Sequence, residues 1–103
     1  MQTLTPQQLK EKMTSGLTVL DVRQAEELAI AALGGVVHIP MNELPARLGE
    51  LNPSAPIAVI CHHGMRSEMA ARFLEKNGFA DVSNLAGGID AWSVAIDSSV
   101  PRY

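Results

Sequence analysis

Residues 57–67 read IAVICHHGMRS, and this segment is the strongest indication of the fold in the sequence. Four apolar residues, which predict a buried strand, lead directly into Cys61, the single cysteine of the 103-residue chain. The turn that follows contains Gly64 and Arg66, and a helical pattern covers residues 68–76. A strand, a tight turn and a helix N-terminus in this order bring backbone N–H groups and the positive end of a helix dipole towards one point. Together with the Arg66 charge, they favour an anionic sulfur.

The composition bounds the class of protein. Hydrophobic residues make up 47% of the chain, so we expect one small domain spanning residues 1–103 with its own core. A single cysteine excludes an internal disulfide framework. The net charge of −3, without a Lys/Arg cluster, argues against nucleic acid and membrane partners. The N-terminus lacks a basic leader, and the longest apolar run, residues 28–37, is too short for a membrane span, so we expect a cytoplasmic protein.

Strand-like and helix-like segments alternate along the chain. The expected strands are residues 18–22, 36–39, 57–60 and 81–85, and the expected helices are residues 6–15, 25–33, 44–51, 68–76 and 89–94. Short connections between them predict an α/β fold with a parallel sheet and helices on both faces. In such sheets the ligand site lies beyond the carboxyl ends of the strands, where we expect Asp21, Arg23, Cys61 and the turn at Gly87–Gly88.

Cys61 has two competing interpretations. Most single cysteines are small apolar side chains in a core. Here the residues after it, His62, His63 and Gly64, are polar or flexible, and Gly64 permits the backbone angles of an anion-binding nest. We therefore expect a reactive thiolate, which could serve acyl transfer, phosphate-ester cleavage or sulfur transfer. Acyl transfer is disfavoured because the two histidines are too close in sequence to act as its base. For the same reason no metal site with Cys61 is expected.

Three regions of the chain resemble the signatures of the rhodanese family. The matching segments are residues 20–23 (LDVR) with 26–28 (EEL), residues 61–67 with 70–74 and 77–79, and residues 84–92 (NLAGGIDAW). The resemblance extends over essentially the whole chain and departs from the family pattern at residues 31–36. It implies a rhodanese-like α/β fold with roughly five parallel strands flanked by helices on both faces.

The resemblance also implies a function. It points to a thiosulfate sulfurtransferase in which catalytic Cys61 carries sulfane sulfur, as a persulfide, from thiosulfate or a persulfide donor to a thiol or cyanide. The implied substrate-binding residues follow it in the loop: His62, His63, Gly64, Met65, Arg66 and Ser67. Sulfurtransferases of this fold have a six-residue loop that begins at the cysteine, and the related phosphatases and arsenate reductases have a longer one. Cys61 through Arg66 makes six residues, which favours sulfur transfer.

Two alternatives stay open: a sulfur-carrier or docking module that passes persulfide between proteins, and a phosphatase or arsenate reductase of the same fold. No cofactor is expected. The expected partners are a small sulfur donor, a thiol acceptor and, as a further candidate, a sulfur-relay protein, with the chain a monomer or weak dimer. Among the supporting residues, the spacing of Arg23 and Glu27 predicts an ion pair between them. Met41, Met65 and Met69 could form an apolar rim for a thiol partner, but core packing is the expectation for Met69, as it is for Trp92.

Overall fold

The computed structural model describes residues 1–103 and contains one sheet of five parallel strands. The strands are β1 (Gln2–Leu4), β2 (Thr18–Asp21), β3 (Val37–His38), β4 (Ile57–Ile60) and β5 (Val82–Leu85), in the order β1-β5-β4-β2-β3. The predicted α/β fold with about five parallel strands is therefore confirmed. Strand β1 was not predicted from its own residues, because two of its three side chains are exposed and it has no apolar pattern. Its pairing with β5 makes it a strand.

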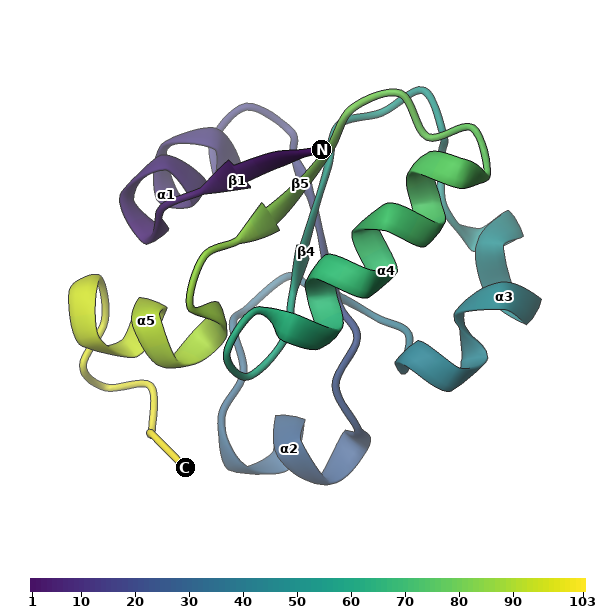
Figure 1. Cartoon of the computed structure of the whole chain (residues 1–103). Helices are drawn as coiled ribbons and strands as arrows, with labels where there is room; N and C mark the ends of the chain where they lie inside the picture. The colour runs from purple at the N-terminus through teal and green to yellow at the C-terminus, as the bar shows by residue number, and fades with distance from the viewer.

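Helices cover both faces of the sheet. They are α1 (Pro6–Met13), α2 (Ala25–Ile30), α3 (Leu44–Arg47), α4 (Met65–Lys76) and α5 (Gly88–Ala95), with single 3-10 turns at Met41–Glu43 and Leu48–Glu50. Helices α1 and α5 lie on one side of the sheet, and α3 and α4 lie on the other (Figure 1). Helix α2 and the C-terminal tail lie near the N-terminus of α4, beyond the end of β4 (Figure 1). None of these helices combines the length and the apolar character that a bilayer crossing requires.

Several helix boundaries differ from the sequence prediction, and two of them have an identifiable local reason. Helix α2 ends at Ile30 and not at residue 33, because Ala31 is extended and buried, and its carbonyl accepts a hydrogen bond of 2.8 Å from Arg23 Nη2. Helix α4 begins at Met65 and not at residue 68, because Gly64, with φ of +102°, turns the chain directly into the helix. The helix expected over residues 44–51 is a single α turn that continues as a 3-10 turn.

The core consists of two apolar clusters, one on each face of the sheet. Successive side chains of a strand point to opposite faces, so β4 contributes to both. Val59 and Cys61 belong to the cluster that contains Leu74 of α4, whereas Ile60 belongs to the cluster that contains Trp92 of α5. The prediction that Trp92 is a core residue is therefore confirmed. The same alternation directs the Cys61 side chain to the α4 face of the sheet.

Candidate active site

Cys61 lies where the carboxyl ends of three neighbouring strands meet. Asp21 at the end of β2 is level with Ile60 at the end of β4, and Asn84 of β5 is level with Val59. Cys61 directly follows β4, so it lies at the edge where parallel α/β sheets bind ligands. Its side chain is 1% exposed, but it forms part of the lining of an open pocket of about 370 Å³. The other lining residues are His62, His63, Met65, Arg66 and Met69.

The Cys61 sulfur has two polar neighbours in its own loop. The Gly64 N–H donates a hydrogen bond of 3.0 Å to Sγ, and Ser67 Oγ lies 3.2 Å from Sγ. A Cβ at position 64 would lie 3.3 Å from both Leu85 O and Gly87 N, and the positive φ adds strain for any other residue. Gly64 is therefore required for the approach of its N–H to the sulfur. The Gly64 N–H and the α4 N-terminus can stabilise a thiolate.

Asn84 of β5 connects the cysteine loop to the sheet. Its Nδ2 donates a hydrogen bond of 3.1 Å to Gly64 O, and its Oδ1 accepts a hydrogen bond from Ser67 Oγ. One buried side chain thus fixes both residues that contact the sulfur. Sequence reasoning gave Asn84 no role, although a polar residue in a fully buried strand is a signal that could have identified it.

The turn before α5 packs against the backbone of the cysteine loop. Ile89 N–H donates to Cys61 O at 2.8 Å, and Asp90 N–H donates to His62 O at 3.1 Å. A Cβ at Gly88 would lie only 2.4 Å from both carbonyl oxygens, and Gly88 has φ of +63°. The predicted role of this glycine pair, a tight turn beside the loop, is confirmed.

Arg66 does not point freely into solvent. Its Nη1 and Nη2 donate to the two carboxylate oxygens of Glu27 at 2.7 and 2.8 Å. The Arg66 hydrogen bond is the largest cause that lowers the pKa of Glu27 to about 2. The same bond is the main cause that raises the pKa of Arg66. The pair stays ionised at neutral pH.

The predicted ion pair between Arg23 and Glu27 is wrong. Arg23 precedes α2 instead of lying within it, so the helical i,i+4 spacing does not apply. Its guanidinium instead folds back onto Asp21, with an Nη2–Oδ2 distance of 2.7 Å, and both side chains are fully buried. Arg23 O also lies 2.7 Å from His38 Nε2, so His38 has the hydrogen bond expected of a strand-end residue.

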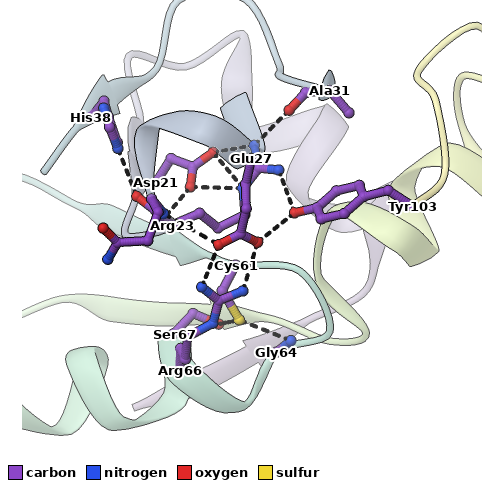
Figure 2. Close-up of polar contacts among 11 residues, drawn as sticks. Asp21, Arg23, Glu27, Ala31, His38, Cys61, Gly64, Arg66, Ser67 and Tyr103 are labelled. Carbon is purple, nitrogen blue, oxygen red and sulfur yellow. Dashed lines mark hydrogen bonds and ion pairs between the residues drawn. The ribbon is translucent and has the colours of Figure 1, made fainter. Parts of the chain in front are cut away.

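The C-terminal residue, Tyr103, contacts the site from the tail. Its hydroxyl donates to Glu27 Oε2 at 2.7 Å and accepts from Arg23 Nη1 at 2.7 Å. Its ring stacks on that of His62 with a centroid distance of 3.8 Å and an interplanar angle of 4°. Figure 2 shows Glu27 between Tyr103 and Arg66, with Arg66 beside the Cys61 sulfur. Nothing in the sequence pattern indicated these contacts.

All seven residues singled out from the sequence lie together. Five of them line the pocket: Cys61, His62, His63, Met65 and Arg66. Gly64 and Ser67 contact the sulfur, and the assignment of substrate binding to these residues stays a prediction. Met69, by contrast, is 62% exposed and borders the pocket, so its predicted place in the core is wrong. No group of three or more His, Cys, Asp or Glu side chains is placed to hold a metal ion.

Comparison with known proteins gives consistent matches. The family model described as Rhodanese-like domain matches residues 5–95. YrkF of Bacillus subtilis, named as a candidate sulfur carrier protein, is 48% identical over 86 residues, which are 82% of this chain and 46% of the relative. The thiosulfate sulfurtransferase GlpE of Ectopseudomonas mendocina is 32% identical over 96% of this chain and 91% of its own. The crystal structure of a rhodanese-related protein from Thermoplasma volcanium matches with a TM-score of 0.84 and 33% identity, covering 98% of this chain and 96% of its own.

Proposed function

This chain belongs to the rhodanese-like domain family, and from that premise we propose that it is a sulfurtransferase working through a persulfide on Cys61. The observation that carries the proposal is the position of Sγ at an open pocket, where it accepts the Gly64 N–H and lies beside Ser67 Oγ. The Gly64 N–H contact suits a sulfur that must be anionic before it reacts. Relatives named for thiosulfate sulfur transfer and for sulfur carriage support the same chemistry.

The reaction has two steps. In the first, the Cys61 thiolate attacks the outer sulfur of thiosulfate or of a persulfide, the donor S–S bond breaks, and sulfite or a thiolate leaves. Cys61 then carries one additional sulfur atom. In the second step, cyanide or a thiolate attacks that outer sulfur, and the Cys61 thiolate is released. The transferred sulfur enters and leaves without an external oxidant or a cofactor.

The loop backbone supports both steps by stabilising negative charge. The Gly64 N–H donates to Sγ, and α4 begins at the next residue, Met65, so the outer sulfur of a persulfide would be stabilised by the free N–H groups of the first turn of α4. Preorganised N–H donors stabilise developing charge without a proton transfer. The histidines, Met65 and Arg66 border the pocket, where donor and acceptor would bind. We further propose that residues 1–103 act as a single domain in the cytoplasm, where the lone thiol stays reduced.

The decisive experiment compares the wild type with Cys61→Ser for transfer from thiosulfate to cyanide and to a thiol. We expect turnover by the wild type and none above background for the variant. Retention of most of the activity by the variant would refute the proposal. Turnover of an aryl phosphate faster than sulfur transfer would instead favour a phosphatase.

A sulfur carrier is the second candidate function. It is favoured by the likeness to YrkF, although this chain spans 46% of that relative's length. A carrier would take up one sulfur per Cys61 and would release it to a partner protein, with slow turnover of small acceptors. An enzyme would give many turnovers with thiosulfate and a small thiol. A burst of a single equivalent followed by no turnover would therefore identify the carrier.

A further inference from the structure

The only permanently charged side chain that lines the Cys61 pocket is Arg66. Both of its terminal nitrogens are occupied by Glu27, at 2.7 and 2.8 Å. Glu27 is itself held by the hydroxyl of Tyr103. A dianion that enters the pocket is therefore attracted only weakly by Arg66, because the Glu27 carboxylate at contact distance cancels most of the field of the guanidinium.

The remaining entrance is rich in apolar surface. The side chains of Met65 and Met69 are 78% and 62% exposed beside the pocket. Met69 also lines an adjoining groove of about 270 Å³. The other residues of that groove are Met41, Leu44, Pro45, Ala70 and Phe73. Taken together, the pocket and the groove, which share Met69, fall in the range of volumes that small organic ligands occupy. Methionine surfaces adapt to carbon skeletons of different shapes.

We infer that Glu27 is a specificity-determining residue, which turns the site away from dianionic thiosulfate and towards a small organic persulfide whose alkyl or aryl group contacts Met69. The inference rests on the proposed sulfur transfer and names its donor. The Cys61 thiolate attacks the outer sulfur of R–S–SH, the S–S bond of the donor breaks, and R–S⁻ leaves. The proton stays on the transferred sulfur or passes to the leaving thiolate, and no oxidant or reductant is consumed.

Glu27→Gln tests this inference because it removes the carboxylate and keeps the size of the side chain. Initial rates are measured with thiosulfate and with benzyl persulfide as donors and with cyanide as the common acceptor. Freeing Arg66 from a partly exposed pair should raise kcat/KM for thiosulfate about fivefold, mainly through a lower KM. The value for benzyl persulfide should change by less than about twofold, because the organic group provides much of its binding.

Glu68→Gln is the matched control. Glu68 lies in the first turn of α4 and pairs with Arg72 at 3.2 Å, so this variant removes one negative charge near the loop without touching Arg66. We expect its ratio of the two kcat/KM values to equal that of the wild type. An unchanged ratio in Glu27→Gln, or an equal shift in both variants, would overturn the inference.

The wild type provides a test that does not depend on how well a variant folds. For each donor, kcat/KM of the wild type is divided by the rate constant of the same donor with free cysteine thiolate. This normalised value should be at least about tenfold higher for benzyl persulfide than for thiosulfate. A preference for thiosulfate would overturn the inference and leave the proposed sulfur transfer intact. No transfer from either donor would overturn both.

Discussion

Ser67 of α4 donates a hydrogen bond to Asn84 of β5, across the interface between the cysteine loop and the sheet. The Asn84 amide group is oriented by its second bond, from Nδ2 to Gly64 O at 3.1 Å, so Oδ1 must be the atom that faces Ser67. Ser67 Oγ in turn lies 3.2 Å from Cys61 Sγ. The sheet therefore controls the polar surroundings of the sulfur through one asparagine.

Asn84→Ala should lower both the stability of the protein and its rate of sulfur transfer. The substitution leaves Gly64 O and the Ser67 hydroxyl without their partner, which should lower the free energy of unfolding by about 1–3 kcal/mol. Loss of loop position should reduce kcat/KM for sulfur transfer about tenfold or more. Urea unfolding and initial rates measure the two effects.

Asn77→Ala is the control for that variant. Asn77 also donates from Nδ2 to a backbone carbonyl, Phe73 O at 2.8 Å, but it is exposed and lies at the far end of α4. We expect unchanged sulfur transfer. Equal losses of activity in both variants would contradict the role given to Asn84.

Gly88→Ala should disrupt the fold around the site. Its Cβ would lie 2.4 Å from Cys61 O and His62 O, and its φ of +63° adds backbone strain. Steric overlap and strain together should cost about 2–5 kcal/mol of unfolding free energy. Gly49→Ala has open space around the new methyl group and no positive φ, so its stability should be unchanged or slightly higher. Thermal unfolding of the two variants, measured in parallel, compares their stabilities. A Gly88→Ala protein as stable as the wild type would argue against the close packing of Gly88 on the cysteine loop.

Asp21→Asn should be among the most destabilising single changes. It leaves the fully buried Arg23 guanidinium without its counter-charge, and breaking a buried pair from one side costs about 3–5 kcal/mol. Glu43→Gln breaks the exposed pair with Arg47, and such pairs contribute at most about 1 kcal/mol. Urea midpoints measure both changes, and similar values would contradict the distinction between the buried and the exposed pair.

Glu27 should give the protein a pH-dependent stability at low pH. Its pKa is about 2 in the folded protein against 4.5 for the free side chain, so its contribution is present above pH 4.5 and disappears as pH falls towards 2. Because Arg66 is partly exposed, the contribution should be on the order of 1 kcal/mol. Unfolding free energies of the wild type and Glu27→Gln should therefore converge between about pH 5 and pH 2. A difference that stays constant over this range would be evidence against the pair in solution.

The sequence was sufficient for the features that depend on neighbouring residues. A four-residue apolar strand, Cys61, the Gly64 turn and an amphipathic helix are consecutive, so the loop that follows β4 and its position at the sheet edge could both be predicted. The Gly87–Gly88 turn was also predictable, because paired glycines mark a close approach of backbone.

The long-range contacts of the site could not be predicted in this way. Arg66 and Glu27 are 39 residues apart, and Tyr103 and Glu27 are 76 residues apart. No periodic pattern connects such positions. Which Asp or Glu side chain pairs with Arg66 depends on the tertiary fold alone. The local spacing even favoured the wrong partner for Glu27, because Arg23 stands outside the helix that would have brought the two together.

The most direct test of persulfide chemistry at Cys61 is the intact mass of the protein after incubation with a sulfur donor. Separate samples are treated with thiosulfate and with an organic persulfide and freed of donor, and part of each is then exposed to cyanide. We predict that the intact wild type gains the mass of one sulfur atom, which a protease digest places on the peptide containing Cys61, and loses it again with cyanide, whereas Cys61→Ser gains nothing. An unchanged wild-type mass with both donors, or an equal gain in Cys61→Ser, would contradict the account.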